Sequence, residues 1–102
     1  MLKLEYYVPK SHVQSTTQAL FAAGAGQIGD YSECCWITEG VGQFRPASAA
    51  NPFIGQLGEL THEPEMKVEL ILRRSLKADV IATLKRSHPY ETPAYQLIAF
   101  EY

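Results

Sequence analysis

Residues 87–95, SHPYETPAY, contain the side chains of this sequence best suited to proton transfer. His88 and Glu91 could act as an acid–base pair, with Tyr90 as a further polar group between them. Two prolines would restrain their geometry, because each proline fixes its own φ angle. The same composition is typical of a rigid connector between a helix and a strand that carries a packed tyrosine. The sequence leaves both interpretations open.

The histidines suggest a second kind of chemistry, the binding of a divalent metal ion. His12, His62 and His88 form no HxH, HxxxH or HExxH pattern. A metal site would therefore need His62 or His88 together with a carboxylate, brought together by the fold or across a subunit interface. Cys34 and Cys35 are soft-metal ligands, but neighbouring strand residues point to opposite faces, so we do not expect them to share an ion.

An irregular stretch at about 47–64 is the third candidate region. Structureless stretches of this length are uncommon in a compact domain and are usually functional or packed. Arg45 beside it could contact an anion, and Asn51 and Phe53 could supply its polar and apolar contacts. We expect the hairpin and loop at 40–58 to form one ligand-binding surface with His88–Glu91, which requires the two segments to touch. The predicted function is a small non-catalytic binding or regulatory module with a protein or small-molecule partner.

Gly40 and Gly42 resemble part of a phosphate-binding loop. The surrounding sequence lacks the GxxxxGK[ST] pattern and does not open a helix, so capture of a phosphate is not supported. The two glycines instead predict a tight turn that leads into a short extended piece at 43–46.

Length and charge exclude several classes of protein. The 102 residues suit a single domain, 1–102, and the net charge of −2 does not favour binding to nucleic acid. No apolar run approaches the roughly 20 residues needed to span a membrane, and the first ten residues alternate too regularly for a signal peptide. Adjacent cysteines favour reduced thiols. We therefore expect a cytoplasmic protein without a nucleic-acid or membrane partner.

Hydrophobic periodicity predicts the elements that must position these residues. Alternating apolar residues indicate strands at 2–8, 32–39, 66–73 and about 94–101. Helical spacing indicates helices at about 11–24 and 75–88, and Ser11 with Gln14 matches a capping box at the start of the first. The order predicts an α+β fold, the ferredoxin-like double βαβ sandwich, with an antiparallel sheet and two helices on one face.

Several predicted strands carry apolar side chains on both faces, namely Tyr7, Ile37, Ile71, Tyr95 and Leu97. Two helices can cover only one face of the sheet, so the other face would need a partner. The sequence therefore predicts a homo-oligomer built through the open sheet face or its edges.

Three strings carry a family resemblance: ALFAAGAGQIGDYSECCW, TEGVGQFRPASAANPFIGQLGEL and HPYETPAY. They resemble the insert domain of the YqfO-type proteins, also called the NGG-interacting-factor-three-like family, over about residues 2–100. The resemblance implies a CutA/PII-like module and, by fold analogy, a trimer, with a dimer as the alternative. The segments TEGVGQFRP and ANPFIG would then occupy the region where PII proteins place their ligand-contacting loop.

The resemblance also limits what can be transferred to this chain. In that family the metal ions are held by domains that flank the insert, so we expect a stand-alone insert without that metal site or a hydrolase activity assigned through it. Divalent metal binding of the CutA kind is an alternative that rests on fold analogy.

Overall fold

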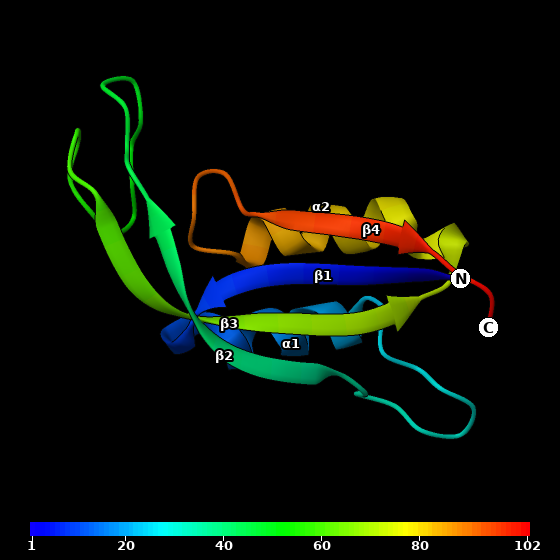
Figure 1. Ribbon diagram of the computed structural model, residues 1–102. Helices are drawn as coiled ribbons and strands as arrows, with labels where there is room; N and C mark the ends of the chain where they lie inside the picture. Colours follow the sequence, from blue (N-terminus) through cyan, green and yellow to red (C-terminus); the bar gives the residue numbers. More distant parts are fainter.

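The chain folds in the order β-α-β-β-α-β (Figure 1), with a short 3₁₀ turn before each helix. The computed structural model describes all residues from 1 to 102. Its strands are β1 (Leu2–Pro9), β2 (Trp36–Phe44), β3 (Thr61–Leu72) and β4 (Tyr95–Ala99). Its helices are α1 (Val13–Ala22) and α2 (Lys77–Ser87), preceded by turns at Lys10–His12 and Arg74–Leu76.

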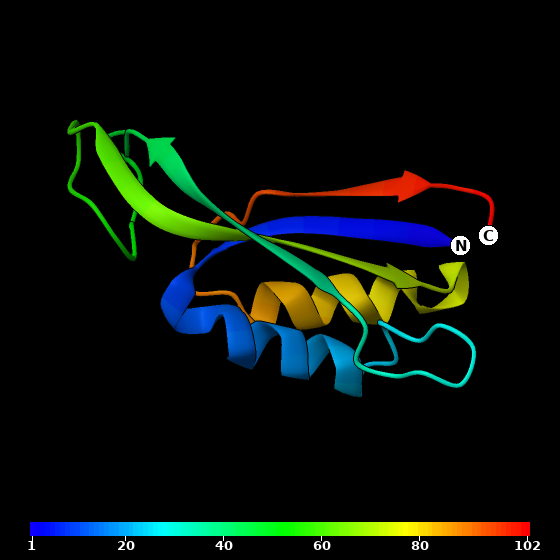
Figure 2. The same ribbon diagram turned by 60° about the horizontal axis from the view of Figure 1, so that its bottom comes forward.

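The four strands form one antiparallel sheet in the order β2-β3-β1-β4. Both helices lie on the same face of this sheet, as Figure 2 shows. This arrangement confirms the predicted ferredoxin-like α+β fold. Neither helix is long and apolar enough to cross a membrane.

The core lies between the two central strands and the helices. Every second residue points into the core in β1 and in the part of β3 that pairs with β1, as the alternation in the sequence predicts. The buried hydrophobic side chains of these strands are Leu2, Leu4, Tyr6, Val8, Met66, Val68, Leu70 and Leu72. Leu20 of α1 and Val80 and Leu84 of α2 close the core from the helix side.

The second strand begins and ends later than the predicted 32–39, and the predicted tight turn at Gly40–Gly42 is wrong. Both glycines lie inside β2, where Gly40 pairs with Glu65 and Gly42 with Glu63. The predicted extended piece at 43–46 is therefore partly the end of β2. The strand continues because β3 starts at Thr61 and supplies a partner for every residue up to Phe44. Residues 45–60 form the actual irregular loop.

The predicted capping box at the start of the first helix is also absent. Ser11 lies in the 3₁₀ turn, where its Oγ bonds His12 Nδ1 at 2.8 Å. The helix starts later, at Val13, and no side chain caps it. Thr16 Oγ1 instead donates to the His12 carbonyl at 2.8 Å, and Tyr6 bonds the same hydroxyl at 2.8 Å.

The apolar residues expected on the open sheet face divide between the two faces. Tyr95 and Leu97 pair with Tyr6 and Leu4, and Ile37 pairs with Val68. Directly paired residues share a face, so these three side chains lie on the helix side. They remain partly exposed because they belong to the outer strands. Of these five side chains, only those of Tyr7 and Ile71 lie on the open face.

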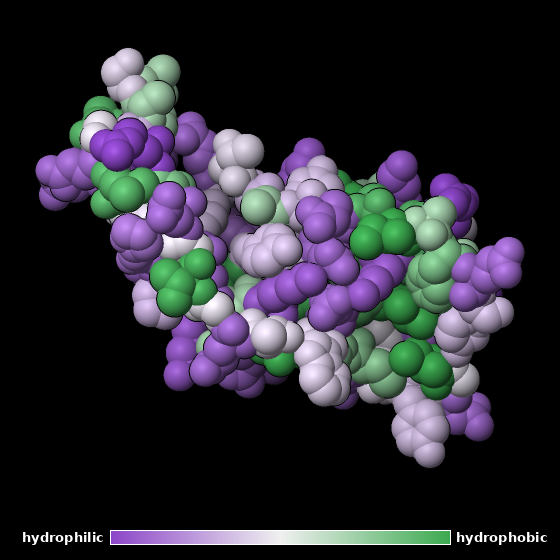
Figure 3. Space-filling model, in the orientation of Figure 1, coloured by the Kyte–Doolittle hydropathy of each residue, from purple (hydrophilic) through white to green (hydrophobic).

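The centre of the open face is a network of charges. Lys3 pairs with Glu69 and, at 3.3 Å, with Glu5, which also lies 3.7 Å from Lys67 Nζ. Gln96 donates to Glu5 at 3.0 Å. Figure 3 shows hydrophilic side chains across the middle of this face, with hydrophobic ones gathered toward the end that carries the termini.

Candidate functional site

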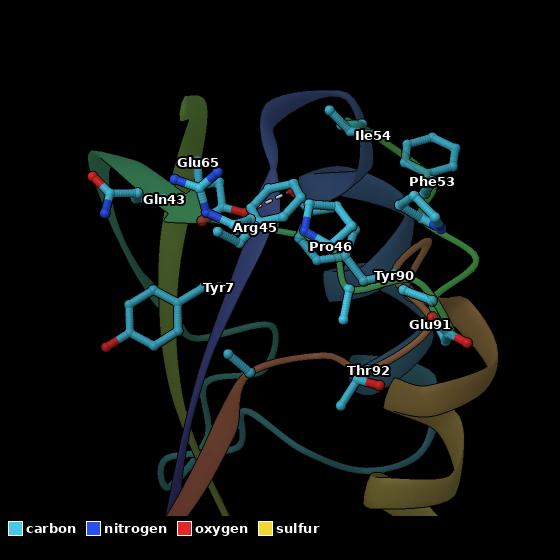
Figure 4. A pocket seen from close by; sticks show the side chains of 15 residues that line it. Tyr7, Gln43, Arg45, Pro46, Phe53, Ile54, Glu65, Tyr90, Glu91 and Thr92 are labelled. Atoms are coloured by element: carbon cyan, nitrogen blue, oxygen red, sulfur yellow. Dashed lines mark hydrogen bonds between the residues drawn. The ribbon is translucent and has the colours of Figure 1, made fainter. Parts of the chain in front are cut away.

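A pocket of about 360 Å³ lies where loop 45–60 meets the body of the protein. One wall comes from β1, β2 and β3, through Tyr7, Phe44 and Glu65. The loop supplies the second wall, and the connector between α2 and β4 the third. Figure 4 shows Tyr7 and Gln43 at one end of the pocket and Phe53 and Ile54 at the other.

The loop closes on itself at its base through Gly58. Arg45 Nη1 donates to the Gly58 carbonyl at 2.7 Å, and the Gly58 amide donates to the Pro46 carbonyl at 2.7 Å. Gly58 has a φ of +77°, a conformation that favours glycine. Arg45 forms no ion pair with Glu65 or Glu91, although all three line the pocket. Arg45 thus holds the loop and still faces the pocket.

The loop and the connector touch, as a shared site requires. The Asn51 amide donates to Glu91 Oε1 at 3.0 Å. The Phe53 ring packs edge-on against His12 at 5.4 Å between centroids and lies 6.5 Å from the Tyr90 ring. Phe53, Tyr90 and Glu91 therefore line the pocket together. Asn51 takes part through its backbone, and its side chain is not in the pocket wall.

Tyr90 joins the connector to the sheet. Its hydroxyl donates to Glu65 Oε2 at 2.7 Å, and its ring lies 6.0 Å from Phe44. Burial raises the pKa of Tyr90 well above its ordinary value, and the bond to Glu65 and the charges of Glu65 and Glu63 raise it further. The hydroxyl is therefore a stable donor at neutral pH. Glu65 could not be singled out from the sequence, because nothing local distinguishes it from Glu63.

Glu65 reaches Tyr90 by passing over Gly42. A Cβ atom at Gly42 would collide with the Glu65 carboxylate, whereas one at Gly40 would have no neighbour within 4 Å. The absence of a side chain at Gly42 therefore gives the Glu65 carboxylate its position.

We expect Gly42→Ala to lower the free energy of unfolding by about 1 kcal/mol, because it displaces Glu65 and breaks the bond from Tyr90. Gly40→Ala, in the same strand, is the matched control. It should raise the free energy of unfolding by about 0.5 kcal/mol, because it lowers the chain entropy of the unfolded state. Urea unfolding of both variants measures the difference. Equal stabilities would show that the close approach of Glu65 does not constrain this position.

His88 is buried, with 6% of its surface exposed, and does not line the pocket. Its Nε2 lies 2.7 Å from the Tyr7 carbonyl, and the Tyr90 amide donates to its Nδ1 at 3.1 Å. The carbonyl needs a donor and the amide needs an acceptor, so both bonds form only with a neutral ring protonated at Nε2. Burial lowers the pKa of His88 below 6.5, even though the Tyr7 bond and Glu65 oppose the shift. The geometry does not fit His88 as an acid, a base or a ligand contact.

The predicted metal residues are in different environments. His62 lies on β3, with its Nε2 2.9 Å from Gln43 Oε1, while both ring nitrogens of His88 are engaged by backbone. The structure contains no group of three or more His, Cys, Asp or Glu side chains arranged to hold a metal ion.

The two cysteines precede β2 and do not lie within it. Cys35 is exposed, Cys34 is partly exposed, and both are free. Both line a second, shallow pocket next to Trp36 and Ile71. The predicted strand at 32–39 therefore starts too early, because β2 begins only at Trp36.

These features define a ferredoxin-like module with a pocket at the base of its longest loop. Solved structures share the fold: CutA1 from Pyrococcus horikoshii has a TM-score of 0.72 at 16% identity, over 99% of this chain and 84% of CutA1. A PII-like protein CutA from Nostoc has a TM-score of 0.70 at 14% identity, over 99% of this chain and 82% of that one. At these identities the likeness shows the fold alone.

Proteins named GTP cyclohydrolase 1 type 2 homolog are similar in sequence. That of Halalkalibacterium halodurans is 44% identical over 97 residues, 95% of this chain and 26% of the relative. That of Bacillus subtilis is 43% identical over 99 residues, 97% of this chain and 26% of the relative. The chain thus spans about a quarter of the length of these curated relatives.

A solved Bacillus cereus protein, described as related to NIF3, has a TM-score of 0.81 at 36% identity, over 94% of this chain and 24% of that one. No protein-family model matches the sequence. The comparisons confirm part of the resemblance: the chain is homologous to one segment of longer, NIF3-related proteins.

Proposed function

We propose that this chain is a small, non-catalytic ligand-binding module whose site is the pocket between loop 45–60 and the connector that follows α2. The observation that carries the proposal is the contact between the two segments. The Asn51–Glu91 bond and the Phe53–Tyr90 pair hold the loop across a pocket of about 360 Å³, within the size range of small-molecule sites. Arg45, Phe53, Tyr90 and Glu91 would contact the ligand.

A catalytic role for His88 and Glu91 has less support. The pair would need His88 within reach of a bound substrate, but its two ring nitrogens already bond backbone groups. Glu91 lines the pocket, but the other titratable side chains in the wall are Tyr7, Arg45, Glu65 and Tyr90, and no histidine or cysteine is among them. Binding without turnover is the simpler use of these groups.

We also propose that the module acts as a homo-oligomer, with a trimer favoured by analogy to CutA-like folds. Trp36 is 67% exposed and Ile98 43% exposed, and the sheet register places both on the open face. These side chains surround the charged centre of that face, and a neighbouring subunit would bury them. The activity named in the longer relatives is not part of this proposal.

Native mass spectrometry of the protein purified from its own cell tests both parts of the proposal. We expect a defined oligomer that retains a small-molecule mass. Ile54→Glu, which places a charge in the pocket wall, should lose that mass, whereas Leu57→Glu, in the same loop but outside the wall, should keep it. Monomers would contradict the oligomer, and a ligand retained equally by both variants would contradict the site.

A further inference from the structure

We infer that the pocket selects ligands that combine a flat apolar group with a cationic amine, and that it disfavours phosphates and carboxylates. This inference rests on the proposed function, because it names the ligand class of the same pocket. It replaces the expectation that Arg45 marks an anion site.

The charged side chains in the pocket wall favour a cation over an anion. Glu65 and Glu91 supply two carboxylates, and Arg45 is the one cation in the wall. Arg45 already donates one N–H to the Gly58 carbonyl at 2.7 Å, which fixes its position in the loop. One oxygen of each carboxylate accepts a bond from the protein, Glu65 from Tyr90 and Glu91 from Asn51. The second oxygen of each is left to accept from a ligand.

Neighbouring groups add to the negative potential. Burial and Glu65 are the main causes of the raised pKa of Tyr90, and Glu63 lies close enough for its charge to raise that pKa further. Lys67 is directed to Glu5 on the open face, at 3.7 Å, and does not line the pocket. His88 lies behind Tyr90 as a neutral ring, because its Nδ1 accepts the Tyr90 amide. A bound anion would therefore meet two carboxylates and a single guanidinium.

The aromatic rings in the pocket wall favour a flat apolar group. Tyr90 lies 6.0 Å from Phe44 and 6.5 Å from Phe53, with interplanar angles of 56° and 51°. Three rings inclined to one another can hold a flat apolar group, and their faces attract a cation. Carboxylates next to aromatic faces form a site that favours an amine over an anion of the same shape.

Three probes with one skeleton test the inference: phenethylamine, 2-phenylethanol and 3-phenylpropanoate, which are cationic, neutral and anionic at pH 7. Titrations followed by NMR of the labelled full chain give the affinity and, from the amides of Phe53 and Tyr90, the location. We expect phenethylamine to bind at least about tenfold more tightly than 3-phenylpropanoate. Glu91→Gln retains an oxygen for the Asn51 amide and should remove most of this preference, leaving 2-phenylethanol unaffected. Glu101→Gln, next to the C-terminus and outside the pocket wall, removes the same charge and should leave the preference intact.

The outcomes separate this inference from the proposed function. Equal binding of all three probes in the pocket, or tightest binding of the anion, overturns the charge preference and leaves the pocket as a binding site. Loss of the preference in Glu101→Gln as well would attribute it to net charge and also overturn the inference. No shift at Phe53 or Tyr90 with any probe overturns both.

Discussion

His88→Ala should lower the free energy of unfolding by about 3 kcal/mol, because it removes a buried ring and both of its hydrogen bonds. The Tyr7 carbonyl and the Tyr90 amide lose their partner, at 2.7 Å and 3.1 Å in the structure. Chemical unfolding in urea at pH 7.5 measures the loss. A change below about 1 kcal/mol would show that His88 is not the structural link between β1 and the connector.

The pH dependence of stability distinguishes this role from simple packing. Burial lowers the pKa of His88 below 6.5, so the unfolded chain binds the proton more readily than the folded one. The stabilisation from neutral His88 is therefore complete above about pH 6.5 and is lost as the pH falls toward the lower pKa of the folded state. His88→Gln offers a similarly placed amide N–H to Tyr7 but does not titrate. The difference in the free energy of unfolding between the wild type and His88→Gln should show this loss as the pH falls. A difference that does not change with pH would contradict the prediction.

Tyr90→Ala should release loop 45–60 from the body and lower the free energy of unfolding by about 2 to 3 kcal/mol. The substitution removes the bond to Glu65 at 2.7 Å and the contacts with the Phe44, Phe53 and His88 rings. Hydrogen exchange should become faster at the amides of Asn51 and Gly58, which bond Glu91 and Pro46. Binding of any pocket ligand should be lost at the same time.

Tyr90→Phe is the matched control for this prediction. It keeps the ring contacts and removes only the hydroxyl, so we expect a loss of about 1 kcal/mol and nearly unchanged exchange in the loop. If Tyr90→Phe releases the loop as fully as Tyr90→Ala, the bond to Glu65 holds the loop and the rings do not. If neither variant changes exchange at Asn51, the loop is held independently of the connector.

The sequence by itself determined the core and the fold. The alternation of Leu2, Leu4, Tyr6 and Val8 decides which face of β1 is buried, because side chains along a strand point to opposite faces. The same holds for the alternating residues from Met66 to Leu72 in β3. With two helical stretches between the strands, this pattern allows few other topologies. It also singled out the loop and the connector that meet at the pocket.

The tertiary structure decided the extent of β2, the faces of the outer strands and the roles of the site residues. Gly40 and Gly42 read locally as a turn, and only pairing with β3 makes them strand residues. Ile37 and Leu97 reach the helix side through their register with the central strands, which the pattern of one strand cannot fix.

His88 illustrates the physical reason most clearly. In SHPYETPAY it is equally suited to be a base, a metal ligand or a packed ring, because its protonation depends on what its two nitrogens meet. One of them meets the Tyr7 carbonyl, 81 positions away in the chain, and the other meets the Tyr90 amide. Partners this distant are set by the packing of β1 against the connector. The sequence therefore indicated where a site could form, and the tertiary contacts decided that His88 is a packed ring behind the pocket while Tyr90 and Glu91 line the pocket.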